Sequence, residues 1–381
     1  MNRQSVYFPG LNGLRAIAAI SVVMSHVTLE LQHFGLNPFI FGTTPEGTPN
    51  GFALAGFGVS IFFTLSGFLI TYLLLKEKET GDINIRKFYL RRILRIWPLY
   101  YLYLAIVVVV TLVSGAPLNG NTLLLYIFYM ANIPLIFQNT INMLGHYWSL
   151  GVEEQFYIFW PWIMKKVNKG IIPLIIVLVT ILMGTRLAIH FFFPNPVLER
   201  ALYLTRFHHL MFGALAAILY DQRHALFLKL VDNKLVQGFC WLVLVLVLLN
   251  KFHVASVIDD DLVAMIAVCI IIGQVNVRNR LINLEVSWMD FLGKISYGIY
   301  VIHVLLLYLF YQLVHHIPLP APFNYLAVYM VVIMASVIVA WLSYNYFEKY
   351  FLKLKTKFVV VKSSASKAQA NQLSEQENAS R

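Results

Sequence analysis

The stretch Leu11–Leu31, LNGLRAIAAISVVMSHVTLEL, decides the fold class of this chain. It is long enough to cross the hydrocarbon core of a bilayer, yet it contains Arg15 and His26. Eleven residues separate these two, which is close to three helical turns, so both lie on one helix face, about 16 Å apart along the axis. Ionisable side chains at membrane depth are costly and mark candidate functional sites. The stretch predicts a membrane helix with a cation toward one surface and an imidazole toward the other.

The composition extends this prediction to the whole chain. Hydrophobic residues make up 59% of the 381 residues and charged residues only 12%, unlike a soluble domain. The first span contains no small-residue cleavage site, so we interpret it as a mature helix rather than a signal peptide. We predict an all-α polytopic membrane protein with ten spans, near Leu11–Leu31, Phe52–Leu75, Trp97–Ser114, Tyr147–Lys166, Ile171–Phe192, His208–Tyr220, Leu235–Asn250, Leu262–Val275, Gly293–Val314 and Tyr325–Phe347.

The distribution of basic residues predicts the orientation of these spans. With ten spans, the excess of Lys and Arg collects on the side of both termini, which are therefore expected to be cytoplasmic. The apolar segment Thr122–Phe137 is interrupted by Asn132-Ile133-Pro134, and counting it as a span would break this charge pattern. We therefore predict an outer re-entrant or interfacial helix there. The net charge of +11 then indicates orientation and contact with anionic lipid or ligand, not nucleic acid. Cys240 and Cys269 lie in apolar segments and support neither a disulfide nor a metal site.

A cluster of arginines precedes the third span. In a helix, Arg91 and Arg92 both lie within one turn of Arg95, so their guanidinium groups gather. Arginine forks suit phosphate groups. The cluster is therefore interpreted either as a clamp for a phosphorylated donor or as a basic collar at the lipid headgroups, and spacing alone favours the collar.

The fourth span begins with the segment Trp148–Tyr157, WSLGVEEQFY, in which two adjacent carboxylates cannot both face lipid. Glu153 is expected about 8 Å below the helix entry, and His26 about 8 Å below the far end of its own span, so the two depths match. A Glu153–His26 pair would orient the imidazole while it takes a proton from a hydroxyl. The alternative is that Glu153 pairs with a structural cation or caps the preceding segment.

Weaker candidates for substrate contact or structural roles lie in other spans. A serine belongs to the small face of the second span, and an arginine in the fifth span needs a buried partner. In the ninth span, a tyrosine lies six residues before a histidine that is expected near mid-membrane. These candidates are Ser66, Arg186, Tyr297 and His303. His208 and His209 are expected at the membrane interface, and Glu348 at a helix end where it would neutralise Arg91, Arg92 or Arg95.

In order along the chain, these segments resemble the acyltransferase-3 family of bacterial integral-membrane acyltransferases. The matching pieces are Gly13–Ala16 with His26, Phe62–Ile70, Arg91–Pro98, Trp148–Tyr157, Ser296–His303 and Tyr346–Glu348. The resemblance implies a transmembrane acyltransferase domain over residues 1–357, followed by a polar cytoplasmic tail, 358–381, whose composition predicts disorder. It also implies a place in the bacterial inner membrane.

The resemblance further implies a reaction and roles for residues. Family members move an acyl group, commonly acetyl, from a coenzyme A thioester to a hydroxyl of an extracytoplasmic or lipid-linked glycan. His26 matches the essential first-span histidine, Arg15 its companion, and Glu153 the glutamate of the fourth-span motif. Arg92 and Arg95, with Arg91 beside them, match the donor-associated pair. Because the chain leaves no room for an added hydrolase-like domain, we expect it to act alone or with a separate partner.

Two other interpretations remain open at this point. A proton-coupled transporter or flippase would use Arg15, His26 and Glu153 as a relay, and it would move substrate without consuming acyl-CoA. A catalytically idle family member would only scaffold an envelope complex. The presence of all three residues argues against this last possibility.

Overall fold

The computed structural model describes residues 6–43, 47–51, 54–167, 169–315 and 317–361. Within these ranges the chain is all-helical, and the only β pairing is an isolated bridge between Thr43 and Pro49. The α-helices are α1 Leu11–Leu29, α2 Leu54–Thr80, α3 Ile85–Val113, α4 Gly120–Ile127, α5 Asn132–Ile136, α6 Trp148–Lys166, α7 Ile171–Phe192, α8 Pro196–Thr205, α9 Phe207–Asp221, α10 Ala225–Val231, α11 Lys234–Leu248, α12 Asp259–Asn276, α13 Ser287–Leu313, α14 Phe323–Ser343 and α15 Lys349–Lys355. The predicted disordered tail, 358–381, lies outside the described residues from 362 onward.

The helices include enough long apolar segments for a multi-pass membrane protein. Among the described residues, seven segments are long and apolar enough to cross a membrane, or eight if the bent pair α10–α11 forms one span. The count of ten is therefore not reached by this measure. Two of the expected spans differ because they are rich in charge: α6 contains Glu153, Glu154, Lys165 and Lys166, and α12 begins with three aspartates.

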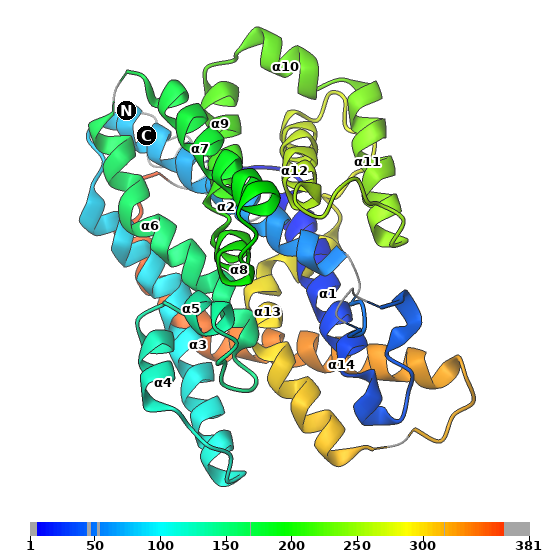
Figure 1. Ribbon diagram of the computed structural model, residues 1–381. Coiled ribbons are helices and arrows are strands. Elements are labelled where there is room, and N and C mark those ends of the chain that lie inside the picture. The colour runs from blue at the N-terminus through cyan, green and yellow to red at the C-terminus, as the bar shows by residue number, and fades with distance from the viewer. Residues whose placement is uncertain (1–5, 44–46, 52–53, 168, 316, 362–381) are drawn as a thin grey trace.

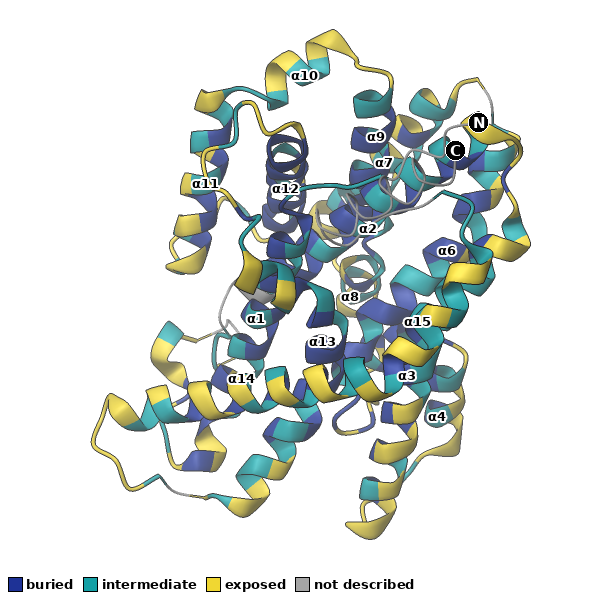
Figure 2. Cartoon of the chain, turned by 180° about the vertical axis from the view of Figure 1, so that it is seen from behind, coloured by how far each residue is buried: buried dark blue, intermediate teal, exposed yellow. Residues whose placement is uncertain are grey.

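The outer helices present apolar side chains outward, as a lipid-facing surface requires. In the most apolar window of α7, only 11% of the residues are buried. In the corresponding window of the long segment 323–358, only 22% are buried. Figure 2 shows the exposed positions along α14 and at the far end of α3, while α12 and the core-facing side of α1 are buried. A hydrophobic helix with so little internal contact is stable in lipid rather than in water.

The segment predicted as a re-entrant or interfacial helix folds as two short helices. α4 has eight residues and α5 has five, and the chain turns between them at Tyr129, whose φ is 57°. Neither helix approaches the roughly 20 residues that a span needs. Gln155 of α6 donates hydrogen bonds to the Tyr129 carbonyl and to Asn132 Oδ1, both at 2.9 Å, which fixes this turn against α6.

The core of the fold is built on close helix crossings. α1 packs against both α2 and α13, and α2 also crosses α9 (Figure 1). Gly67 of α2 and Gly213 of α9 make that crossing possible, because a Cβ at either position would stand about 2 Å from a carbonyl oxygen of the other helix. Small residues at such crossings are a general device of membrane helices, in which association depends on close packing. The predicted small face of the second span thus serves packing at Gly67.

Replacing Gly213 by alanine is expected to destabilise the fold. An added Cβ would lie 2.0 Å from the Thr64 carbonyl oxygen, so α2 and α9 would have to separate. We expect a loss of about 3 kcal/mol, at the upper end for overpacking, measured as a lower melting temperature in detergent. The matched control is Gly184→Ala in α7, where no atom lies within 4 Å. An unchanged melting temperature for Gly213→Ala would contradict the crossing.

The last segment contains a π-helical turn, Tyr344–Glu348, between α14 and α15. This turn continues the helix instead of ending it, contrary to the expectation from sequence. Glu348 is buried and accepts a hydrogen bond from Ser343 Oγ at 3.1 Å, with the charge of Arg95 close enough to interact. Among the described residues Glu348 forms no ion pair within 4.0 Å with any of the three arginines that it was expected to neutralise, and only the charge of Arg95 acts on it at longer range.

Candidate active site

Five helices surround an internal pocket with a volume of about 100 Å³. α1, α2, α3, α6 and α13 each contribute side chains to its wall. Residues predicted from the sequence form most of its polar lining: Arg15, Ser66, Arg92, Arg95, Glu153 and Tyr297. Segments that are up to 285 positions apart in the chain therefore meet at one site, from Arg15 to Tyr300.

The carboxylate of Glu153 is held by two hydroxyl groups. Ser66 Oγ donates to Glu153 Oε1 at 2.7 Å, and the Tyr157 hydroxyl donates to Oε2 at 3.1 Å. Tyr157 follows Glu153 by one helical turn, so both face the pocket from α6. Across the pocket, the Tyr297 hydroxyl donates to the Ile96 carbonyl at 2.6 Å and so ties α13 to α3.

The pocket contains more positive than negative charge. Its lining includes the guanidinium groups of Arg15, Arg92 and Arg95 but only one carboxylate, that of Glu153. Within the described part of the chain, none of these three arginines makes an ion pair within 4.0 Å, and Arg92 Nε is buried without a hydrogen-bond partner. Charges taken out of water require compensation. The pocket is therefore suited to an anionic ligand.

Arg91 is not part of this lining. Its Nη2 pairs with Glu77 Oε2 at 2.8 Å, and its Nη1 donates to the Phe358 carbonyl at 3.1 Å. Neighbouring residues on a helix point about 100° apart. Arg91 therefore faces the α2 end and the C-terminal segment, while Arg92 faces the pocket, so the structure does not bring the three predicted arginines together in one lining.

His26 lies in a cluster of three histidines rather than beside Glu153. His26 Nδ1 is 2.7 Å from His303 Nε2, and the two ring planes differ by only 16°, with centroids 4.9 Å apart. The ring of His146, which precedes α6, lies 5.2 Å from that of His303 and 6.4 Å from that of His26. The predicted Glu153–His26 pair is therefore not formed among the described residues: Glu153 accepts hydrogen bonds from Ser66 and Tyr157, whereas His26 contacts His303.

Tyr300 and Ser149 join the pocket to the histidine cluster. Both line the pocket, and the Tyr300 hydroxyl lies 2.5 Å from Ser149 Oγ. The same hydroxyl donates to the His146 carbonyl at 2.9 Å, and the Tyr300 ring lies 6.0 Å from that of His303. The arginine pocket and the histidines are therefore adjacent layers of one polar region.

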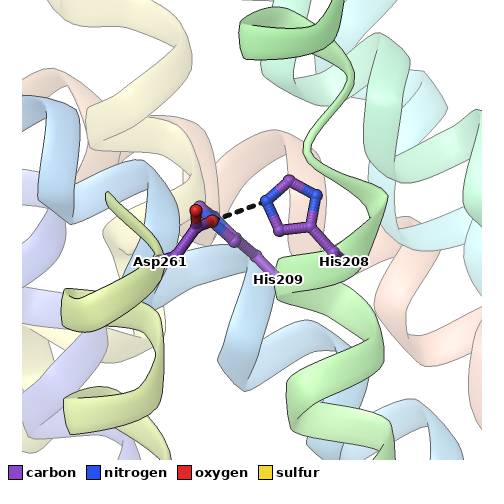
Figure 3. Close-up of side chains that lie close together, drawn as sticks. All are labelled: His208, His209 and Asp261. Atoms are coloured by element: carbon purple, nitrogen blue, oxygen red, sulfur yellow. Dashed lines mark hydrogen bonds and ion pairs between the residues drawn. The ribbon is translucent and has the colours of Figure 1, made fainter. Parts of the chain in front are cut away.

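A second polar cluster lies between α7, α9 and α12, as Figure 3 shows for three of its members. His208 and His209 are buried, not interfacial as expected, and their Nε2 atoms lie 2.7 and 2.9 Å from the same Asp261 oxygen. Arg186 finds the buried partner that its position required, with Nη1 at 3.3 Å from Asp261 Oδ2. Arg206 pairs with Asp260 at 3.2 Å.

The histidines and Asp261 offer three atoms within 4.8 Å of one another, which is close enough for a candidate metal site. Donor atoms bound at about 2.0 Å to one tetrahedral zinc ion lie about 3.3 Å apart, which is longer than the two distances of 2.7 and 2.9 Å observed here. The nearby guanidinium groups also balance the two aspartates. The geometry therefore fits a hydrogen-bonded ion network.

Arg206→Met is expected to unfold this region. Arg206 is 1% exposed, and its side chain also donates to Ser60 Oγ on α2 at 3.1 Å. Its removal leaves Asp260 buried with Arg186 only at 4.0 Å. Breaking one partner of a buried pair costs about 3–5 kcal/mol, so the melting temperature in detergent should fall steeply. His253→Ala removes the exposed partner of Asp259, which keeps its hydrogen bonds from the Val254 and Ala255 amides, so this control should change little.

Five residues of the polar region were not among the predicted sites: His146, Ser149, Tyr157, Ser296 and Tyr300. Ser149 and Tyr157 are one turn before and after Glu153, and Tyr300 is one turn before His303, so helical spacing contained the signal for them. His146 lies in a short 3-10 turn, where no helix periodicity predicts its direction.

The fold and the pocket define an integral membrane protein with an internal, cationic site. The chain belongs to the acyltransferase-3 family, since the family model, described as an acyltransferase domain, matches residues 8–345. It is 29% identical over 336 residues to "Putative peptidoglycan O-acetyltransferase YrhL" of Bacillus subtilis strain 168, covering 78% of this chain and 48% of the relative. It is 30% identical over 201 residues to "O-acetyltransferase OatA" of Staphylococcus aureus strain NCTC 8325 / PS 47, covering 49% of this chain and 30% of the relative.

The chain thus spans about half or less of the length of these curated relatives. No solved structure matches it.

Proposed function

We propose that this protein transfers an acyl group, commonly acetyl, from acyl-CoA on the cytoplasmic side to a hydroxyl of an extracytoplasmic glycan. The observation that supports this most directly is the pocket in which three arginines, which form no ion pair with any described residue, lie next to the histidine cluster. Membership of an acyltransferase family agrees with it. The proposed setting is the bacterial cytoplasmic membrane, with Arg92 and Arg95 toward the cytoplasm as the positive-inside pattern predicts.

The donor is proposed to bind through its phosphates at Arg92 and Arg95. The two lie one turn apart on α3, and guanidinium forks bind phosphate oxygens through paired, charge-assisted hydrogen bonds. A volume of about 100 Å³ is well below that of pockets for drug-sized ligands. This volume suits the acyl group and the narrow pantetheine end of coenzyme A, whereas the nucleotide part would lie at the mouth of the pocket. Arg15 and Glu153 then flank the arm of the donor.

His26 is proposed to act as the general base. It takes a proton from the acceptor hydroxyl, the oxygen attacks the thioester carbonyl, and the carbon–sulfur bond breaks. The thiolate of coenzyme A then takes up the proton, so that one ester and one thiol are formed. Because the relatives are named for peptidoglycan O-acetylation and O-acetylation, we propose a cell-wall glycan, free or lipid-linked, as the acceptor.

The test uses the full chain, purified in detergent and in lipid nanodiscs. Radiolabelled acetyl-CoA is supplied with and without peptidoglycan fragments or lipid-linked glycan, and both free coenzyme A and labelled glycan are measured. We expect acceptor-dependent release of coenzyme A with equal transfer of label. Glycan movement in proteoliposomes without any loss of acetyl-CoA would overturn the proposal in favour of a transporter.

A further inference from the structure

The hydrogen bonds of the histidine cluster define which nitrogen of His26 has a free lone pair. His303 Nδ1 lies 3.1 Å from the Ile299 carbonyl oxygen, one helical turn earlier on α13. A carbonyl oxygen only accepts hydrogen bonds, so Nδ1 of His303 must be protonated. In a neutral imidazole the other nitrogen is then an acceptor. His303 Nε2 therefore accepts, and His26 Nδ1, at 2.7 Å, must donate.

The surroundings favour neutral rings in this cluster. His303 is fully buried, and no carboxylate is among its described hydrogen-bond or ion-pair partners. His146 Nε2 lies 3.1 Å from the Val301 carbonyl, and its Nδ1 is buried without a partner. A cationic His146 would leave a buried N–H unpaired, whereas a neutral ring leaves only a lone pair. An unpaired buried imidazolium is costly, so each ring has one proton.

We propose that His303 is a positioning residue that fixes His26 as the Nδ1–H tautomer and leaves His26 Nε2 as the reactive nitrogen. This inference extends the proposed function and assumes that His26 is its base. The Ile299 carbonyl fixes His303, and His303 in turn fixes His26, so a backbone atom of α13 determines the chemistry of a side chain on α1. His26 is half-buried, unlike the fully buried His303.

The experiment compares two substitutions of similar shape at position 303. His303→Gln can place an amide oxygen near the former Nε2 and still accept from His26, whereas His303→Met fills the space without a comparable acceptor. We expect Met to lower kcat on the order of 10²-fold, less than the roughly 10⁴-fold effect of a fixed wrong tautomer elsewhere, because a His26 ring without a partner still samples the reactive tautomer. The donor KM should be unchanged because the arginine pocket is untouched. Gln should restore most of kcat. His315→Met, at an exposed position, is the control.

A direct readout separates this inference from the proposed function. The full chain is labelled with ¹⁵N-histidine in nanodiscs, and the His26 signals are assigned by comparison with His26→Ala among the 11 histidines. The inference is supported if His26 Nε2 is unprotonated in the wild type and in the His303→Gln variant, but not in the His303→Met variant. A protonated Nε2 in the wild type, or a Met variant with the wild-type tautomer and kcat, overturns it. If the tautomer is as expected but no acyl group is transferred, the proposed function alone fails.

Discussion

His26→Ala is expected to abolish acyl transfer while the protein remains folded in the membrane. General-base catalysis contributes about 10²–10⁴-fold to a rate. No other group in the cluster is expected to replace His26, because His303 and His146 are both buried. We expect turnover to fall on the order of 10³-fold or more. The measurement is release of coenzyme A and transfer of label to glycan by purified protein.

The controls for this variant separate chemistry from folding and donor binding. Binding of acyl-CoA should be retained, because the arginines of the pocket are on the other side of Tyr300 and Ser149. His190→Ala, at an exposed position near Glu199, should keep full turnover. A folded His26→Ala protein with near-normal turnover would remove His26 from the mechanism.

The double variant Arg92→Ala/Arg95→Ala is expected to have the second-largest effect, on donor affinity. Hydrogen bonds to a charged group contribute about 1.5–3 kcal/mol each, so the loss of both forks should weaken acyl-CoA binding by about 10²–10⁴-fold. The dissociation constant for acyl-CoA, measured by titration calorimetry at two salt concentrations, tests this. We expect a weaker salt dependence in the variant because fewer charges face the phosphates.

Arg86→Ala is the matched control for this pair. Arg86 lies on the same helix, but it is exposed and does not line the pocket. The Arg86→Ala substitution removes one positive charge, as each substitution at 92 and 95 does. It should leave the affinity for acyl-CoA nearly unchanged if binding depends on the position of the arginines and not on net charge. Single Lys variants at 92 and 95 should be intermediate, since they retain charge but lose the fork. Equal losses for Arg86→Ala and Arg95→Ala would favour a basic collar instead.

The sequence predicted which residues face the pocket better than it predicted their partners. Arg15, Ser66, Arg92, Arg95, Glu153 and Tyr297 all line one pocket, because a polar side chain within an apolar helix must turn inward. The pairing of Glu153 with His26 failed because helical rise gives depth along the axis but not the direction around it. α1 packs along α13, so His26 meets His303 instead.

The second polar cluster shows that a single sequence does not reveal partners that lie far apart in the chain. His208 and His209 begin a helix, which on its own suggests an interface. Their buried partner, Asp261, lies 52 residues beyond His209 and on a different helix, and no local pattern links them. The number of spans is also hard to judge from local composition, because α6 and α12 contain charges that residues on other helices compensate.

The order of these charges along the chain has a consequence for biosynthesis. Asp260 and Asp261 pair with Arg186, Arg206, His208 and His209, all of which are synthesised earlier. Glu153 likewise follows Arg15 and Arg92, whose charges act on it. Placing a lone charged residue at the centre of a membrane helix costs about 2.5–3.5 kcal/mol during insertion. In both clusters the acidic helix therefore leaves the ribosome after its basic partners, and it enters the bilayer beside helices that already neutralise it.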